Sequence, residues 1–238
     1  MLSYLFITFL YQPLFNGLVV FYQFIPGNDF GIAIISLTLL LRFVLYPLSA
    51  KAIVAQRRLA LLQPKVKELQ ERLKNDKEKQ AKEILDLYKR EGINPFAGIG
   101  PILLQFPILI AMYRVFWNGL GAEELSQFLY SFIPHPGVID PSFLGMIMLS
   151  EKSLGIALMA GFFQFLQTKH ATQMSSSAGS SSDMARIMQK QMTIIFPMVT
   201  AGIVSQLPSA IGIYWITTSI FSLWQQWRLQ GKKTNEEA

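Results

Sequence analysis

One arginine lies inside a long apolar stretch, a position that requires a chemical explanation. Arg42 comes twelve residues into the stretch 30–50, which is long enough to cross a bilayer. At about 1.5 Å per residue it lies ~18 Å from Phe30, near or beyond mid-membrane. A charge at that depth costs roughly 2.5–3.5 kcal/mol on insertion scales, so it requires water or a counter-ion. The stretch therefore predicts an electrostatic site for an anionic group.

The counter-ion of Arg42 is not found in the expected membrane helices, which contain no aspartate or glutamate. We therefore expect Arg42 to face a water-filled cavity, with its anionic partner supplied from outside the protein. The alternative is a snorkelling anchor whose helix ends near Arg42. The apolar run continues from Phe43 to Tyr46, which favours the first interpretation.

The composition is typical of a membrane protein with several spans. Of the 238 residues 51% are hydrophobic, and the mean hydropathy is +0.34. The chain has no cysteine, which excludes disulfides and thiol chemistry. The net charge of +6 is concentrated between the apolar runs, so it reports topology. Sequence-specific nucleic-acid binding is not expected.

Residues 1–29 precede the first expected span. Apolar residues recur there at helical spacing, namely Tyr11, Leu14, Phe15, Leu18, Val19 and Tyr22. No basic segment precedes them and no small-residue cleavage site follows, so a cleaved signal peptide is not expected. We expect a helix that lies in the outer membrane interface, with a sixth span as the alternative.

Residues 51–97 are strongly charged, with twelve basic and seven acidic residues. Pro64 is expected in the first turn of a helix, and Asn75–Asp76 is a turn and N-cap signal. Two apolar stripes follow from helical spacing: Val66, Leu69 and Leu73, then Ala81, Ile84, Leu85 and Tyr88. Gly92 ends the second helix. The segment is predicted to be a charged cytoplasmic helical hairpin.

Residues 98–228 supply four more spans, at about 99–118, 153–167, 192–206 and 209–227. The second and third of these four are only about 15 residues long, below the usual ~20. Polar edges extend them, or the bilayer thins around them. Residues 229–238 form a short cytoplasmic tail.

Basic residues set the orientation. All of them except Arg42, Arg114 and Lys152 fall in 51–97, in 169–190 or at the carboxyl end. Five spans with the amino terminus outside place these three regions in the cytoplasm, as the positive-inside rule requires. The predicted fold class is an all-α polytopic membrane protein with five transmembrane helices.

No catalytic constellation emerges, so no enzyme activity, metal or cofactor is expected. His135 and His170 lie far from other candidate ligands, and none of HExxH, GxSxG, P-loop or GxGxxG occurs. The spans do contain scattered polar residues, namely Ser36, Thr38, Gln105, Gln164, Gln167, Thr217, Thr218, Ser222, Gln225 and Gln226. Helix–helix hydrogen bonding explains each of them singly. Together with Arg42 they favour a shared hydrated groove.

Several stretches, in their order and spacing, resemble the YidC/Oxa/Alb family of membrane-protein insertases. They are Leu41-Arg42 with Tyr46-Pro47-Leu48, Leu62-Gln63-Pro64, Gly92-Ile93-Asn94-Pro95, PILLQFPI at 101–108 and IYWITT at 213–218. The resemblance covers residues 10–228. It implies five spans around a hydrophilic groove that opens to cytoplasm and lipid and is closed to the outside.

The resemblance implies that the groove is lined by Arg42, Gln167 and Trp215. From their places in the spans we add further groove candidates: Gln105, Thr38, Ser36, Gln164 and Thr218. The hairpin matches the region of the family that receives substrate, and its candidate residues are Pro64, Leu69, Leu73, Ile84 and Tyr88.

The implied function is insertion of nascent hydrophobic segments into a bacterial plasma membrane. The implied partners are nascent membrane proteins and the bilayer, with the ribosome and the Sec translocon as further candidates. The sequence departs from many family members, because no large extracytoplasmic domain and no lipoprotein-type cysteine are expected. The short basic tail also weakens ribosome tethering. A lipid scramblase and a small secondary transporter are the alternatives, although no inverted repeat is detectable.

Overall fold

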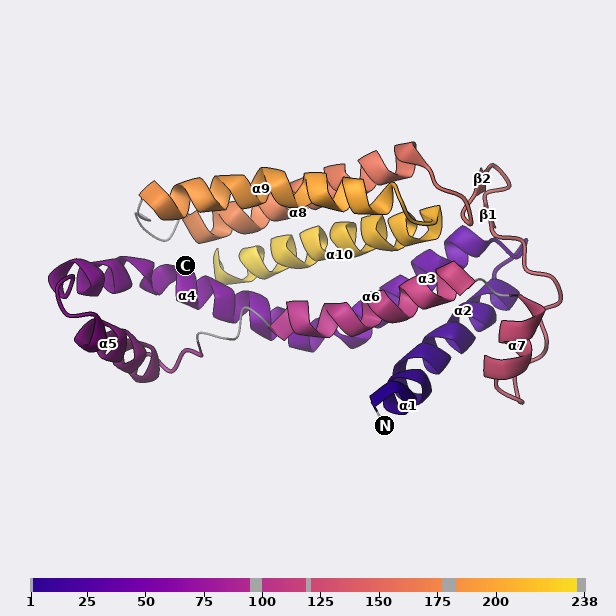
Figure 1. Ribbon diagram of the computed structural model, residues 1–238, viewed down its shortest axis with the longest axis horizontal. Helices are drawn as coiled ribbons and strands as arrows, with labels where there is room; N and C mark the ends of the chain where they lie inside the picture. Colours follow the sequence, from indigo (N-terminus) through magenta and orange to yellow (C-terminus); the bar gives the residue numbers. More distant parts are fainter. Residues whose placement is uncertain (1, 95–99, 119–120, 177–182, 235–238) are drawn as a thin grey trace.

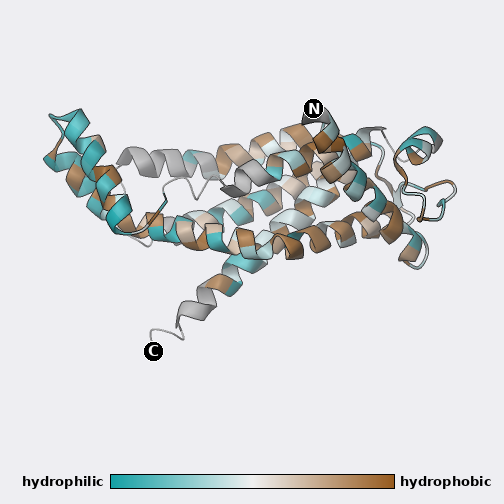
Figure 2. Ribbon diagram, turned by 90° about the horizontal axis from the view of Figure 1, so that it is seen from below, coloured by the Kyte–Doolittle hydropathy of each residue, from teal (hydrophilic) through white to brown (hydrophobic). Residues whose placement is uncertain are grey.

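The computed structural model describes residues 2–94, 100–118, 121–176 and 183–234. Helices form almost all of the regular structure in these residues, as the predicted fold class requires. Most of them run along one long axis, with a helical hairpin at one end and loops with a small β-hairpin at the other (Figure 1). Hydrophilic residues dominate the helical hairpin, whereas the other helices are largely hydrophobic (Figure 2).

The amino-terminal helix begins as α1 (Leu2–Phe6), passes through a π-helical turn, η1 (Ile7–Tyr11), and continues as α2 (Gln12–Phe24). All six apolar residues of its predicted stripe are buried. The helix contacts α3 and α6 of the bundle, described below. Tyr4–Phe24 is long and apolar enough to cross a membrane, which fits the sixth span that the sequence left as an alternative.

The first predicted span is two helices. α3 (Phe30–Val44) begins at Asp29, whose carboxylate accepts from the backbone N–H of Ile32 at 2.8 Å. α3 and α4 (Tyr46–Arg72) meet at a bend of 62°. The predicted span 30–50 is therefore bent near Leu45 and is not one straight helix. Pro47 explains the break, because a proline fits the first turn of a new helix but not a helix interior.

The predicted hairpin is formed by α4 and α5 (Lys77–Arg90). Asp76 caps α5 as predicted, accepting from the N–H of Lys79 at 3.0 Å. Gly92 follows the end of α5 with φ +64, a left-handed conformation that favours glycine. The prediction for Pro64 was wrong, because α4 begins at Tyr46 and runs through this proline.

Four further helices are long enough to cross the hydrocarbon core: α6 (Gly100–Asn118), α8 (Leu154–Ser176), α9 (Asp183–Val204) and α10 (Ser209–Thr234). Their 19 to 26 residues correspond to about 28–39 Å. α8 and α9 exceed the predicted spans because their polar edges are helical.

Hydropathy adds a stricter test of the membrane helices. By length and composition, one helix of the described residues could cross a membrane, or two if the bent pair α3–α4 counts as one span. Thr193–Val204 is apolar but shorter. Polar side chains lower the hydropathy of the other long helices. The arrangement of five spans therefore stays a prediction.

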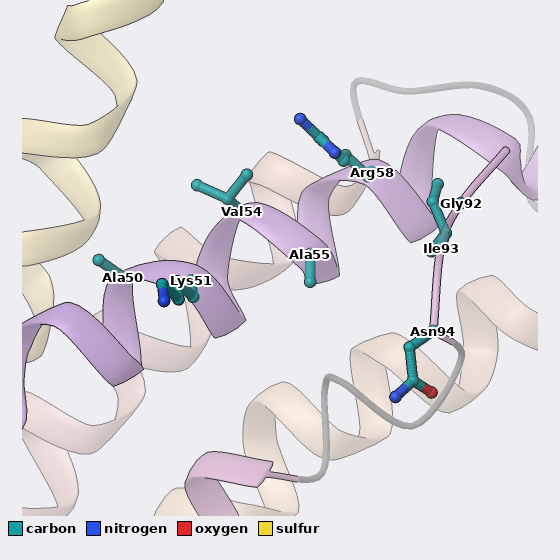
Figure 3. Close-up of a pocket in the computed structure, with 8 residues that line it drawn as sticks. All are labelled: Ala50, Lys51, Val54, Ala55, Arg58, Gly92, Ile93 and Asn94. Atoms are coloured by element: carbon teal, nitrogen blue, oxygen red, sulfur yellow. The ribbon is translucent and has the colours of Figure 1, made fainter.

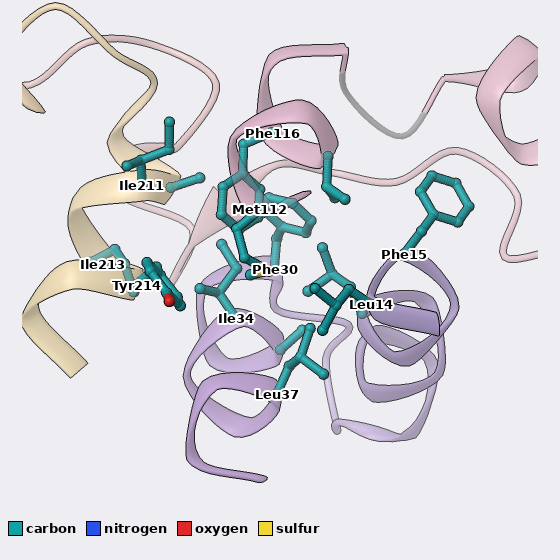
Figure 4. Packing of buried hydrophobic residues seen from close by; sticks show 14 of the residues in the cluster. Leu14, Phe15, Phe30, Ile34, Leu37, Met112, Phe116, Ile211, Ile213 and Tyr214 are labelled. Carbon is teal, nitrogen blue, oxygen red and sulfur yellow. The ribbon is translucent and has the colours of Figure 1, made fainter. Parts of the chain in front are cut away.

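The central helix is α10, which contacts α3, α4, α6, α8 and α9. In Figure 1 it lies between the α8–α9 pair and the α3–α6 pair. The main apolar core fills the space between α2, α3, α6 and the first turns of α10 (Figure 4). Phe15, Ile34, Met112 and Ile211 are almost completely buried there.

The loops opposite the hairpin are fastened to the helix ends. They contain α7 (Ala122–Phe128) and the strands β1 (Ser142–Phe143) and β2 (Ile147–Met148). Buried Asn16 donates to the carbonyl of Phe128 and accepts from the N–H of Tyr130, both at 2.8 Å. A Cβ on Gly31 would lie 2.1 Å from the Phe143 ring, so only glycine permits this contact. These contacts hold the loops against α2 and α3.

Candidate functional site: a polar face on the central helix

Polar side chains gather on α10. Its buried polar residues are Ser209, Thr217, Thr218, Ser219, Ser222, Gln225 and Gln226. A buried polar group is costly unless it is hydrogen-bonded, so these residues require partners within the helix or on neighbouring helices. Ser209, Thr217 and Ser222 donate to backbone carbonyls. The side-chain partners of Ser219, Gln225 and Gln226 lie on α4 and α8. Together with Tyr214, which connects α10 to α6 and α3, these contacts divide the polar face into three clusters.

The first cluster joins α3, α6 and α10 through one glutamine. Arg42 Nη2 donates to Gln105 Oε1 at 3.0 Å, and Gln105 Nε2 donates to the Tyr214 hydroxyl at 2.5 Å. Tyr214 is only 3% exposed, and Arg42 is partly buried. Both ends of the amide are occupied, so Gln105 holds the guanidinium in a fixed position. The structure thus brings together two predicted groove residues, Arg42 and Gln105.

The charge of Arg42 is poorly compensated. Among the described residues no carboxylate lies within 4.0 Å of it. Its helix ends two residues later, at Val44, and the partial negative charge of a helix carboxyl end stabilises a cation by roughly 0.3–1 kcal/mol. This amount and one neutral amide offset only part of the cost of desolvating a cation. The guanidinium therefore retains a strong tendency to bind an anion.

The position of Arg42 combines features of both sequence interpretations. The helix end near Arg42 is what a snorkelling anchor would require. The hydrogen bond to Gln105 on α6, however, directs the guanidinium toward a neighbouring helix and toward Tyr214 on α10. This direction is the one expected for a site between helices.

The second cluster joins α8 and α10. Trp215 Nε1 donates to Gln164 Oε1 at 2.8 Å, and the Ser219 hydroxyl lies 3.4 Å from the same oxygen. The Gln164 amide nitrogen lies 3.3 Å from the Thr168 hydroxyl. Two predicted groove residues, Gln164 and Trp215, are thus in direct contact. Gln167 is partly buried on α8 and takes part in neither of these clusters.

The third cluster connects α10 to the start of α4. Gln225 is 2% exposed, and its Nε2 donates to the carbonyl of Tyr46 at 3.2 Å and to the Ser49 hydroxyl at 2.8 Å. These two groups lie directly after the bend between α3 and α4. Gln225 therefore holds the bend against α10. One residue further, Gln226 Oε1 lies 3.2 Å from His170 Nδ1 of α8.

The other predicted groove residues are placed less directly. Thr38 is fully buried and donates to the carbonyl of Ile34 at 2.6 Å, so its hydroxyl is satisfied within α3. Thr218 is buried on α10 one turn beyond Tyr214, and Ser36 is partly buried on α3. Their role in a groove stays a prediction. In the part of the chain that the structure describes, no group of three acidic or histidine side chains could hold a metal ion.

The predicted substrate-receiving residues lie on a thinly packed hairpin. Leu69, Leu73, Ile84 and Tyr88 are half-buried, whereas Pro64 is exposed. No described residue of α5 is fully buried. Two exposed contacts join the two sides of the hairpin. The Gln80 side chain donates to the carbonyl of Gln70, and Lys65 forms an ion pair of 2.7 Å with Glu91. Apolar surface therefore stays accessible here, and its use in receiving substrate stays a prediction.

A family model described as "60Kd inner membrane protein" matches residues 20–236. This match covers both α3 with Arg42 and α10 with its polar face. The chain belongs to this family. Its membership places the chain in the inner membrane of a bacterium.

Individual relatives agree with the family. The chain is 34% identical to "Membrane protein insertase YidC" of Wolinella succinogenes over 94% of its own length and 37% of that protein. It is 32% identical to the proteins of the same name from Francisella philomiragia subsp. philomiragia and Francisella tularensis subsp. novicida, over 84% of its length and 32% of theirs. The chain thus spans about a third of the curated relatives that it matches.

Two residues of this site were not singled out by the sequence. Tyr214 belongs to the IYWITT stretch that carries the family resemblance, but no role was predicted for it. In the structure its hydroxyl accepts a hydrogen bond from Gln105, the partner of Arg42. Gln225 was one of many scattered polar residues, yet it holds the α3–α4 bend. The available signal was weak: a glutamine in an apolar helix shows that a partner exists but not which helix supplies it.

Proposed function

We propose that this chain is a membrane-protein insertase that receives nascent hydrophobic segments from the cytoplasm and releases them into the bilayer. The observation that supports it most is the Arg42–Gln105–Tyr214 cluster, a poorly compensated positive charge inside a helix bundle. The relatives named as insertases, which are longer than this chain, support the same activity.

The proposed mechanism uses the polar face of α10 as a hydrated groove. A hydrophobic segment approaches from the side of the helical hairpin, and its polar flank is hydrated beside Arg42 instead of meeting lipid. Arg42 attracts acidic groups on that flank, a gain of about 4 kcal/mol for a pair at ~4 Å and an effective dielectric of ~20. The hydrogen-bonded loops around Asn16 and Phe143 close the opposite end, so the segment leaves sideways into lipid.

The proposed topology places the amino terminus outside and the hairpin inside, with five spans and the groove between them. Single cysteines at Ser126 in α7 and at Lys74 in the hairpin tip test this arrangement, since both residues are exposed. A membrane-impermeant thiol reagent should label Ser126→Cys only from outside and Lys74→Cys only from inside. Labelling of both from one side would refute the topology.

Reconstitution into liposomes tests the function itself. The purified chain should insert a short single-span substrate, and the same vesicles should show neither accelerated lipid flipping nor solute uptake. Lipid flipping without insertion would identify a scramblase instead, and solute uptake without insertion would identify a transporter. The ribosome and the Sec translocon are candidate partners, and omitting both from the liposomes shows whether insertion requires them.

A further inference from the structure

The base of the helical hairpin contains a pocket of about 490 Å³ (Figure 3). Arg42 does not line it. Its lining residues are Ala50, Lys51, Val54, Ala55 and Arg58 of α4 and Gly92, Ile93 and Asn94 of the segment after α5. Figure 3 shows this segment descending beside α4. Two of the eight lining residues are basic and none is acidic, so the pocket favours an anion with an apolar part.

The wall of the pocket is fixed by hydrogen bonds. Gly92 adopts φ +64, and the N–H of Ile93 donates to the carbonyl of Tyr88 at 2.9 Å, which closes the end of α5. Next to it, Lys65 pairs with Glu91 at 2.7 Å and ties this turn to α4. The pocket is therefore part of the hairpin's folded structure.

The two basic residues have unsatisfied charge. Lys51 and Arg58 are seven residues apart, so they lie on one face of α4 about 10 Å apart along its axis. Both are exposed. In the described ranges, neither has a carboxylate within 4.0 Å. A ligand with negative charge can therefore reach both cations at little cost in desolvation.

With α3 along the membrane normal and the membrane interface at Tyr46, the pocket would lie at the level of lipid headgroups. Aromatic residues mark the membrane interface, and Tyr46 at the start of α4 packs against Trp224 of α10 with ring centroids 6.2 Å apart. Arg58 is twelve residues further, about 18 Å along α4. Because α4 bends 62° away from α3, this distance corresponds to only about 8 Å along the direction of α3. The headgroup layer on each side of a bilayer is roughly 5–8 Å thick.

We propose that this pocket binds the headgroup of an anionic phospholipid. The phosphate interacts with Lys51 and Arg58, and the glycerol and first acyl carbons cover Val54, Ala55 and Ile93. A lipid fits better than an acidic peptide, because the pocket combines its cations with apolar walls and opens where headgroups are abundant. This site requires only that the chain be embedded in a membrane, so it does not depend on the insertase function.

Native mass spectrometry of the full chain in detergent tests this site, with phosphatidylglycerol as the probe and phosphatidylcholine as the neutral comparison. The Lys51→Gln/Arg58→Gln variant should bind phosphatidylglycerol about fivefold more weakly for each lost cation, and phosphatidylcholine unchanged. The matched control, Arg72→Gln/Lys74→Gln, removes the same charge at the hairpin tip. It should bind like the unmodified chain.

A second variant tests the apolar part without changing charge. Ala55→Phe fills the pocket and should weaken phosphatidylglycerol binding as well, while the chain keeps its thermal stability. Equal weakening in the hairpin-tip control would mean general attraction to anionic lipid and would overturn the proposal. It would also be overturned if a soluble acidic peptide bound the pocket and phosphatidylglycerol did not.

Discussion

Replacing Gln105 by glutamate would neutralise Arg42 without changing the shape of the site. The Gln105 oxygen already accepts from Arg42 Nη2 at 3.0 Å, so an introduced carboxylate oxygen takes the same place. At ~4 Å and an effective dielectric of ~20, one carboxylate is attracted to a guanidinium by about 4 kcal/mol. The introduced carboxylate repels a second one by a similar amount, so an acidic group on a substrate gains almost nothing from Arg42 in this variant.

Two opposite effects should follow from this Gln105→Glu substitution. Insertion of a substrate with two acidic residues before its apolar segment should fall at least tenfold, which corresponds to ~1.4 kcal/mol of the lost attraction. The protein itself should become more stable, because a charged hydrogen bond contributes about 1.5–3 kcal/mol and replaces a neutral one. A gain of 1 kcal/mol raises the melting temperature by about 2–4 °C for a chain of this size.

The assay is insertion into liposomes of matched substrates with zero, one or two acidic residues, together with thermal unfolding in detergent. The substrate without acidic residues is the internal control and should be inserted at the unmodified rate. An equal loss for all three substrates would refute the electrostatic role of Arg42, since that role requires dependence on substrate charge.

Three further substitutions test other parts of the structure. Arg42→Lys should retain most insertion of acidic substrates whereas Arg42→Ala should lose it selectively, and equal behaviour of the two variants in the same liposome assay would contradict this. Gly31→Ala should lower the free energy of unfolding by about 1–3 kcal/mol, because the new methyl group would lie 2.1 Å from the Phe143 ring. Gly202→Ala, with no atom within 4 Å of its methyl group, is the control and should be harmless in the same thermal unfolding experiment. Gln225→Leu should cost about 1 kcal/mol, because two partly buried polar groups at the α3–α4 bend lose a partner, and hydrogen exchange at that bend should increase.

Local patterns in the sequence predicted local structure well. The stripe from Tyr11 to Tyr22 is buried, Asp76 caps α5 and Gly92 follows its end. Each of these depends on a few neighbouring residues and on simple rules of helical spacing and capping. The bend at Leu45 escaped prediction although Pro47 marked it, because the apolar run through Tyr46 suggested a continuous span.

Contacts between distant helices could not be predicted in the same way. The presence of Arg42 and Gln105 in separate spans indicated polar sites, but the choice of Gln105 as the partner of Arg42 depends on how α3 and α6 rotate about their axes. Side-chain packing along several helices sets this rotation. Likewise, Gly31 has no signal of its own in the sequence, and its close contact with Phe143 appears only when the loop folds over α3.

The hydrogen bonds of Asn16 have a consequence for the order of assembly during synthesis. Its partner at Phe128 lies 112 residues later in the chain. Ribosomes add about 5–20 residues per second, so α2 waits roughly 6–22 s before this partner exists. Until then the Asn16 amide lacks two of its final partners, at a cost of about 1–3 kcal/mol if it is surrounded by lipid. The Asn16 side chain can therefore complete its hydrogen bonds only after α7 has been made, and water or another protein would stabilise its amide during that interval.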